Sequence, residues 1–567
     1  MPAVLLRIFW AVLSALLLAI AAPLSLPAHP WLSALHLRTS LLPGYSAHDG
    51  YAQVALAAFV ALIPLLEAAR LSRRPLEAAL YGYLTGFLWL ALHFDWLGSF
   101  GLAVVLLLAF YFALPIALFA WIAHIVLRER RPGLALWGLS AAWVGLEYLR
   151  SFGFWAFPWN ALGYTQVRHL PLIQVADLGG VLLVSFLVVT CNLGIYLLIA
   201  PLGAGRHRLG HAALAASLLA SALAYGEARL NLPPSESGRP FKVGIVQGGM
   251  ETLRAWDSEM MSDTLALYVP PSRELLGLSA LQQGTLRQGL RPGLRPGTSV
   301  MARGLSGAVQ QPATPSGAET LLIWPEAVLP VSVDPRRPER LPGEVRMLLP
   351  PGRRDSLLMG AQGRPRDMRH AENGCLLLEP GGQMVWGHSK VRLVPYGEVV
   401  PFRGLVRFLQ YPWGDYDLTE GRDLQPLLWH GRKLALLVCF DTLFPWETRE
   451  QVKHGAGLIV VVTNNSWYKL HSGIRQHCDQ DILRAVETRR TLARCSTTGW
   501  SQIIDPAGRV LAETNVESAG RLSRMVDTRK GLTPYALLGD WLGQLCVLAA
   551  LLLVVPRLIA GRSESFL

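Results

Sequence analysis

The chain has 567 residues, of which 51% are apolar and only 16% are charged, and its mean hydropathy is +0.32. A soluble domain is typically about 25% charged, so the composition excludes an ordinary soluble protein and indicates membrane segments. The formal net charge of +12 does not indicate a nucleic-acid-binding protein, because many arginines stand in short connectors between apolar runs and form no basic face with interleaved aromatic residues.

Eight apolar runs approach the length of about 20 residues that a membrane-spanning helix needs. Seven precede residue 226 and one lies near the C-terminus: 8–24, 52–69, 76–93, 100–127, 134–149, 175–202, 210–225 and 537–555. The first run follows Arg7 and could be a signal peptide, but its length and the spans that follow favour a retained helix. We therefore predict a membrane domain at residues 1–226 and a C-terminal membrane helix with its tail at residues 534–567.

Arginines mark alternate connectors between these runs. They are Arg70, Arg73 and Arg74 after the second run, Arg128, Arg130 and Arg131 after the fourth, Arg206 and Arg208 after the sixth, and Arg557 and Arg562 after the eighth. The connector at 95–99 has no Lys or Arg. Because cationic loops stay cytoplasmic, we predict that both termini are cytoplasmic and that residues 227–533 lie outside.

The connector at 151–171, which contains SFGFWAFPWNALGYTQ, is aromatic and carries little charge. Trp and Tyr favour the membrane–water interface. This connector is therefore either an anchoring belt or the lining of an opening for a lipid substrate.

Residues 227–533 have more glycine, proline and charge, and they contain short β-like runs. These runs are 241–247, 320–324, 356–359, 374–379, 434–438, 458–463 and 500–504, and a helical pattern covers 473–492. Strands that alternate with helices indicate an α/β domain. The segment 270–317, with RQGLRPGLRPG, fits this pattern poorly, and we predict a flexible insertion there without assigned chemistry.

Three apolar runs of this domain lead into a polar residue with a proline nearby: Glu326 in LLIWPEAVLP, Lys390 in GHSKVRLVPYGEVVPF and Cys439 in GRKLALLVCFDTLFPW. A thiol attacks as the thiolate, and a buried carboxylate can take its proton. A lysine can stabilise the charge on the tetrahedral intermediate. Taken singly, Cys439 could be an inert core thiol, and Glu326 and Lys390 could be surface charges. The six cysteines show no CxxC motif or paired spacing, so neither disulfides nor a zinc or other metal site are implied.

Taken together, WPEA, KVRLVPYGE and VCFD resemble the Glu–Lys–Cys triad motifs of the carbon–nitrogen hydrolase (nitrilase) superfamily. A longer set resembles the apolipoprotein N-acyltransferase family within it. This set comprises VQGG followed by Trp256-Asp257, TNNSWY, Gln476-His477, RAVE, GLTPYALLGDW and, in the membrane half, FPWNALGYTQ. The resemblance runs from the first apolar run to the last.

The resemblance implies an α-helical membrane domain of about eight spans in a bacterial inner membrane, with an extracytoplasmic α/β domain, a nitrilase-like αββα sandwich, in the periplasm. Cys439 would be the nucleophile, Glu326 the general base and Lys390 the stabiliser of the tetrahedral intermediate. The supporting or substrate-binding residues would be Glu398 beside the lysine, Trp256 on a mobile arm over the site, Phe440 and Asp441 beside the thiol, with the N–H of Phe440 as an oxyanion donor, and Trp467.

The implied reaction transfers an acyl chain from a phospholipid to the α-amine of a diacylglyceryl-cysteine at the N-terminus of a lipoprotein, through a thioester and without a metal, nucleotide or other cofactor. The partners would be the phospholipid donor, the apolipoprotein acceptor and the membrane, with no nucleic acid, and we expect a monomer. Two alternatives stay open: a membrane-tethered amidase or nitrilase, and a transporter or lipid-binding protein with a degenerate outer domain. The scarcity of charges inside the apolar runs disfavours a transporter.

Three positions depart from the pattern of the family. Phe440 and Asp441 stand where Tyr and Glu are frequent, and Asn465 stands where Asp is common. None of the three belongs to the triad, so the departures bear on how the acceptor is recognised rather than on the reaction type.

Overall fold

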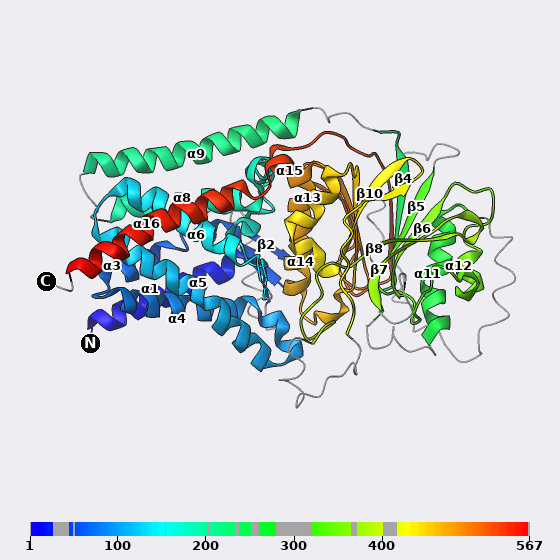
Figure 1. Cartoon of the computed structure of the whole chain (residues 1–567), viewed down its shortest axis with the longest axis horizontal. Coiled ribbons are helices and arrows are strands. Elements are labelled where there is room, and N and C mark those ends of the chain that lie inside the picture. Colours follow the sequence, from blue (N-terminus) through cyan, green and yellow to red (C-terminus); the bar gives the residue numbers. More distant parts are fainter. Residues whose placement is uncertain are drawn as a thin grey trace.

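The computed structural model describes residues 2–25, 45–48, 51–153, 155–200, 205–232, 238–250, 260–278, 319–364, 371–400 and 417–564. Two parts follow one another along the longest axis of the molecule (Figure 1). A bundle of helices occupies one end and carries both termini at its free face, and a domain of two sheets with flanking helices occupies the other.

The long helices of the bundle fall on the apolar runs of the sequence. They are α1 (Pro2–Ala21), α3 (Ile63–Leu71), α4 (Pro75–His93), α5 (Leu102–Arg128), α6 (Leu139–Leu149), α8 (Ala176–Ile199), α9 (Gly205–Asn231) and α16 (Trp541–Glu564). Within the described residues, four segments are long and apolar enough to cross a membrane, namely Ala3–Ala21, Leu102–Arg128, Ala176–Ile199 and Arg206–Asn231. Leu134–Leu149 and Trp541–Arg557 are shorter apolar helices.

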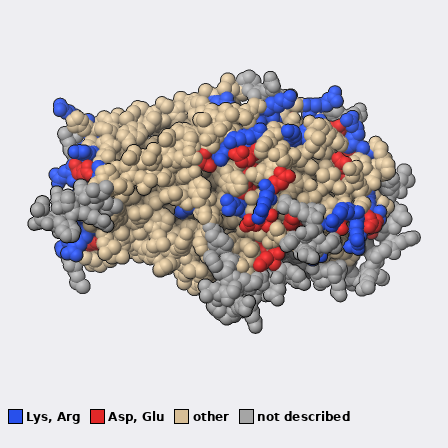
Figure 2. Space-filling model, in the orientation of Figure 1, with Lys and Arg blue, Asp and Glu red and all other residues tan. Residues whose placement is uncertain are grey.

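The outer surface of the bundle is apolar. Figure 2 shows Lys, Arg, Asp and Glu gathered at the free end of the bundle and over the two-sheet domain, with a surface almost without them in between. Helix α5 exposes Leu102, Leu107 and Phe110 there by 68%, 64% and 58%. Large side chains exposed in a continuous apolar band fit a lipid environment and not water.

The second apolar run, expected as one span at 52–69, is not a continuous helix. It starts as strand β3 (Tyr51–Val54), which pairs with β1 (Leu24–Ser25) and β2 (Tyr45–His48), and becomes α-helical only at Ile63. The side-chain amide of Gln53 donates to the carbonyls of Ala21 and Thr165, both at 3.0 Å. These bonds tie the segment to its neighbours in an extended form, which a run of apolar letters does not reveal.

The last apolar run is also divided. Helix α15 (Pro534–Leu538) ends at Gly539, whose φ of +70° favours glycine, and α16 then begins at Trp541. Helix α9 extends to Asn231, five residues beyond the boundary expected at 226.

Two six-stranded sheets form the second domain. One has the order β14-β13-β12-β11-β10-β9 and the other β15-β4-β5-β6-β7-β8. The strands of the first are β9 (Leu427–Trp429), β10 (Arg432–Val438), β11 (Leu458–Thr463), β12 (Thr491–Ser496), β13 (Gln502–Ile504) and β14 (Val510–Glu513). Those of the second are β4 (Phe241–Gln247), β5 (Thr320–Trp324), β6 (Ser356–Gly363), β7 (Glu372–Leu378), β8 (Met384–Ser389) and β15 (Gly520–Val526).

The sheets pack face to face, and helices cover both outer faces. Val243, Ile323, Leu436 and Val460 belong to the buried core between the sheets. Helices α13 (Pro445–Lys453) and α14 (His471–Thr488) cover the first sheet on the side of the bundle, and α11 (Met261–Leu275) and α12 (Gly343–Arg346) cover the second (Figure 1). The layers are therefore α, β, β, α, as the family resemblance implies.

The expected insertion at 270–317 begins too early. Helix α11 continues through Pro270 and Pro271 to Leu275, with Tyr268 and Val269 buried against the second sheet. Packing of this apolar face outweighs the helix-breaking tendency of the two prolines. Residues 279–317 lie outside the described residues, as does Trp256.

Helix α14 joins the two parts of the molecule. The side-chain oxygen of Gln476 accepts hydrogen bonds from the indole N–H groups of Trp96, at 3.0 Å, and Trp159, at 2.7 Å, which both come from the bundle. At the end of α14, Arg489 forms an ion pair with Asp177 of α8 at 2.7 Å. The joint is polar, aromatic and buried, so it holds the first sheet in a fixed position on the bundle.

Candidate active site

Cys439 follows directly on strand β10 and has a left-handed backbone, with φ of +49°. That conformation costs a non-glycine residue about 1–2 kcal/mol, so the surroundings must impose it. The buried carboxylate of Asp441 does so by accepting the N–H of Val438 at 3.1 Å. The thiol is 8% exposed and belongs to the core between the sheets. A sharp turn at a strand end thus holds the sulfur against the facing sheet.

Glu326 reaches the same place from the end of β5 in the facing sheet and is 6% exposed. Its Oε1 accepts the side-chain N–H of Asn373 at 2.7 Å, and its Oε2 accepts the backbone N–H of Asn464 at 2.7 Å. Lys390, which follows β8 and is 1% exposed, has its Nζ 3.6 Å from Glu326 Oε1. The structure therefore brings the predicted acid and lysine together.

Glu398 lies on the other side of the lysine. The ammonium of Lys390 donates to Glu398 Oε1 at 2.8 Å, and Glu398 Oε2 accepts the N–H of Val394 at 2.8 Å. The amide of Asn373 donates to both acids, at 2.7 Å to Glu326 and 3.0 Å to Glu398. The lysine and this amide together fix the two carboxylates in one arrangement.

Burial dominates the titration of the three central groups. Burial raises the pKa of Glu326. The charge of Lys390 lowers this pKa, and the charge of Glu398 raises it. Burial alone would lower the pKa of Lys390, but the carboxylates of Glu398 and Glu326 outweigh it and hold that pKa well above its ordinary value. Burial, then Glu326, raise the pKa of the Cys439 thiol to about 12, against the opposing effect of Lys390. The resting site thus holds a protonated thiol beside a basic carboxyl group and a permanent cation.

Asp441 connects the backbone around Cys439 with the backbone that follows Lys390. Its carboxylate is fully buried, and Oδ1 accepts the backbone N–H groups of Val391, at 3.2 Å, and Arg392, at 2.9 Å. These two residues follow Lys390 directly. Asp441 therefore fixes the backbone beside Cys439 and Lys390. Its buried carboxylate is not accessible to a substrate.

Among the other predicted residues, Phe440 lies next to the thiol and its ring stacks on Phe157 of the aromatic connector, with centroids 6.1 Å apart. Trp467 is the last residue of the short helix Asn465–Trp467. This helix begins directly after Asn464, whose backbone N–H binds Glu326. Its carbonyl accepts a long hydrogen bond of 3.4 Å from the hydroxyl of Ser99 in the bundle. Trp256 lies outside the described residues.

Asn373, Asn464 and His477 were not predicted as members of the site. Asn464 stands in TNNSWY and His477 in the Gln476-His477 pair, so both lie in quoted motifs. No sequence motif marked Asn373 as a site residue. Its only indication is its position on β7, the strand that neighbours β8. The residues that it contacts are 25 and 47 positions away in the sequence.

Gly360 of β6 leaves room for Glu326, and we expect its replacement to disturb catalysis. A Cβ on Gly360 would lie 2.4 Å from the Cα of Glu326 and 2.7 Å from the carbonyl of Pro325. Both are backbone atoms, so Gly360→Ala must displace the carboxylate. A shift of about 1 Å costs on the order of 10²-fold in rate, measured as the single-turnover reaction of the protein with a short ester. Gly343→Ala, where a Cβ meets nothing within 4 Å, is the matched control. Equal rates for the two variants would contradict the prediction.

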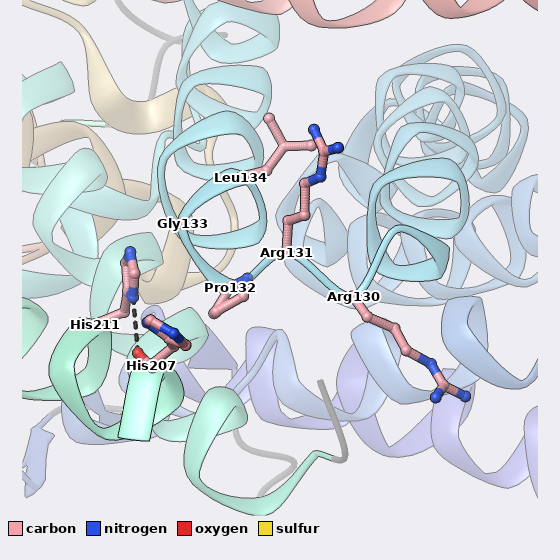
Figure 3. A pocket seen from close by; sticks show the side chains of 7 residues that line it. All are labelled: Arg130, Arg131, Pro132, Gly133, Leu134, His207 and His211. Carbon is pink, nitrogen blue, oxygen red and sulfur yellow. Dashed lines mark hydrogen bonds between the residues drawn. The ribbon is translucent and has the colours of Figure 1, made fainter. Parts of the chain in front are cut away.

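A separate pocket of about 430 Å³ lies at the free end of the bundle, far from strand β10, which leads into Cys439. Its lining is Arg130, Arg131, Pro132, Gly133, Leu134, His207 and His211. In Figure 3 Arg130 extends away from the two histidines, so the cationic side chains do not converge on one ligand. Among the described residues no group of three or more His, Cys, Asp or Glu is placed to hold a metal ion.

Comparison with known proteins agrees with this geometry. Residues 45–194 match the family described as apolipoprotein N-acyltransferase N-terminal domain, and residues 242–530 match the family described as carbon–nitrogen hydrolase. The apolipoprotein N-acyltransferase of Geobacter metallireducens is 30% identical over 530 residues, covering 90% of this chain and 91% of the relative. The chain belongs to the apolipoprotein N-acyltransferase family. The resemblance predicted from the motifs is confirmed.

A second member of the apolipoprotein N-acyltransferase family, from Gloeobacter violaceus, is 32% identical over 524 residues, covering 89% of this chain and 90% of the relative. Among solved structures, a mutant form of the amidase of the nitrilase superfamily from Nesterenkonia AN1 matches with a TM-score of 0.32 and 20% identity. That match covers 55% of this chain and 96% of the amidase.

Proposed function

We propose that this chain is an N-acyltransferase that moves a fatty acyl chain from a phospholipid to the α-amino group of the N-terminal diacylglyceryl-cysteine of lipoproteins. The names of its relatives support this function. The observation that carries it is the stacking of Phe157, from the aromatic connector of the bundle, on Phe440 beside the thiol. A thiol at the junction of an apolar bundle and a hydrolase domain can meet an ester in a bilayer, which an amidase for small soluble amides does not require.

In the first half-reaction, Glu326 takes the proton of the Cys439 thiol and the sulfur attacks the ester carbonyl of the phospholipid. The new C–S bond places negative charge on the carbonyl oxygen, which the Lys390 ammonium and the N–H of Phe440 stabilise. The ester C–O bond then breaks, and the lysophospholipid oxygen leaves with the proton held by Glu326. An S-acyl Cys439 thioester remains.

In the second half-reaction, the α-amine of the lipoprotein attacks the thioester carbonyl and gives its proton to Glu326. The C–N bond forms, the C–S bond breaks, and the sulfur regains the proton, so the enzyme returns to its initial state. A thioester suits this ping-pong route because it divides one difficult transfer into two easier ones. Glu398 holds Lys390 in place, and Trp256 and Trp467 contribute to substrate binding.

The topology belongs to the same proposal. About eight spans, from a membrane domain at 1–226 and a C-terminal helix at 534–567, anchor the chain in the bacterial inner membrane as a monomer. The arginine-rich connectors and both termini face the cytoplasm, and the catalytic domain at 227–533 faces the periplasm. The location of both termini at the free end of the bundle supports an even number of crossings.

The test is the mass of the purified protein after incubation with phospholipid and no acceptor. We expect one added acyl chain on Cys439, labile to hydroxylamine, and none on Cys439→Ala. Addition of a peptide with an N-terminal diacylglyceryl-cysteine should transfer that chain to the peptide amine. An unmodified mass of the folded protein would refute the thioester. An acyl-enzyme discharged by water as fast as by the peptide would favour a membrane-tethered hydrolase.

A further inference from the structure

The carbonyl of Cys439 is held from the side of helix α14. It lies 3.2 Å from Nε2 of His477, a fully buried residue of that helix. Helix α14 covers the outer face of the first sheet, whereas Glu326 and Lys390 follow strands of the sheet on the opposite side. The carbonyl of the nucleophile therefore points away from the two catalytic groups.

The direction of this carbonyl determines the direction of the next N–H. Among the described residues all peptide bonds are trans, and in a planar trans peptide the C=O and N–H bonds point in opposite directions. With the Cys439 carbonyl held toward α14, the N–H of Phe440 points toward the facing sheet. That is the side from which Lys390 approaches, and it is where negative charge develops on the ester oxygen.

The hydrogen bonds of the ring place the proton of His477 on Nε2. Nδ1 lies 3.2 Å from Nη2 of Arg494 and 3.1 Å from Nδ2 of Asn465. An arginine only donates. The side-chain oxygen of Asn465 already accepts from Arg494 and from Ser496, both at 2.9 Å, which leaves its NH₂ group to face the ring. Nδ1 is therefore the acceptor and Nε2 the donor.

The ring stays neutral and fixed. Burial, then the charge of Arg494, lower the pKa of His477 well below its ordinary value. Arg494 is itself fully buried and paired with Asp481 at 2.6 Å. Trp159 of the aromatic connector packs on the imidazole with centroids 5.6 Å apart, and Tyr468 meets it edge-on at 6.0 Å. The bundle thus contributes directly to the position of this histidine.

We propose that His477 is a positioning residue for acyl transfer, whose Nε2–H holds the Cys439 carbonyl so that the Phe440 N–H is aimed at the developing oxyanion. The proposal rests on the proposed function and adds a residue to its machinery. His477 does not touch the substrate or take part in proton transfer. It acts on the barrier of ester attack and not on the reactivity of the thiol.

Two reactions of Cys439 distinguish an effect on the oxyanion from an effect on the reactivity of the thiol. Attack on the ester p-nitrophenyl butyrate develops an oxyanion, whereas alkylation by iodoacetamide at an sp³ carbon develops none. We expect His477→Phe, which keeps a ring for Trp159 to pack on, to lower the single-turnover acylation rate by about 10²-fold. The alkylation rate and the KM for the ester should stay within about threefold of wild type. His477→Gln, whose amide can donate in place of Nε2, should recover most of the loss.

Thr442→Val is the matched control. The Thr442 hydroxyl also lies near Nε2 of His477, at 3.2 Å. We expect its loss to leave the bond to Cys439 in place and both rates near wild type. Thermal unfolding accompanies every variant, and His477→Asn, too short to reach the carbonyl, provides a second test if His477→Phe does not fold. A parallel fall of acylation and alkylation, or unchanged acylation in a folded variant, would overturn the proposal. The probe is a soluble ester, so the role of His477 can be tested without phospholipid. An enzyme that reacts with the soluble ester but not with phospholipid would refute the proposed function, and the comparison of the His477 variants would still be valid.

Discussion

Glu326→Gln is expected to lower the rate of Cys439 acylation at neutral pH by about 10²–10⁴-fold, the usual contribution of a general base. With the thiol pKa raised to about 12, only about one thiol in 10⁵ is ionised at pH 7 without help. The glutamine has nearly the same shape but cannot take the proton. Single-turnover acylation with a short ester, followed by intact mass, measures the loss.

The pH profiles should differ in form as well as in height. In the wild type the base works only when ionised, so the rate is present above the raised pKa of Glu326 and lost as the pH falls through it. In Glu326→Gln the rate should follow the thiolate alone and rise about tenfold per pH unit up to the pKa of the thiol, which the loss of the Glu326 charge places below its wild-type value. A variant that kept the wild-type profile would show that another group is the base.

Glu319→Gln is the matched control for this experiment. Glu319 stands just before the other end of β5, is buried to a similar degree and is paired with Arg432. It lies remote from the thiol at the opposite end of the same strand. Its replacement should change folding stability at most and leave both the acylation rate and the pH profile unchanged.

The sequence was sufficient to predict the strands that lead to Glu326 and Cys439. The runs 321–324 and 434–438, which precede Glu326 and Cys439, are wholly apolar, because these parts of β5 and β10 are buried on both faces. A polar residue that ends such a run lies at the carboxyl edge of its sheet. The strand before Lys390 was not predicted, because MVWGHS in β8 is only half-buried and mixes polar with apolar residues. The lysine was instead recognised from its motif.

Strand β12 shows why the remaining elements could not be read locally. The helical pattern at 473–492 continues past the true end of α14 at Thr488 into a strand that contains Arg494. A charged residue does not indicate a buried strand, yet Arg494 is fully buried because Asp481 and Asn465 pair with it from other elements. The contacts of His477 and Gln476 likewise depend on partners distant in sequence. Local patterns therefore predict the layers, whereas the groups that orient the site emerge only from tertiary packing.

Lys390→Met is expected to lower the acylation rate by more than about 10³-fold, which exceeds the usual effect of losing one oxyanion donor. The lysine stands between Glu326 and Glu398, at 3.6 Å and 2.8 Å. Without it the buried carboxylate of Glu326 and the half-buried carboxylate of Glu398 face each other across Asn373, and like charges in one site drive the pKa of one of them upward. The acidic limb of any residual activity should therefore move to higher pH.

The double variant Lys390→Met/Glu398→Gln separates folding from chemistry. Removing one partner of a buried ion pair destabilises a protein by roughly 3–5 kcal/mol, mostly because a charge is left without compensation. Replacing Glu398 as well removes that charge, so the double variant should regain much of the lost thermal stability while its acylation rate stays low. Recovery of activity together with stability would mean that the lysine only supports the fold. Because Glu326 keeps its bonds to Asn373 and Asn464 in both variants, a low rate in a stable double variant would assign the loss to the missing ammonium itself.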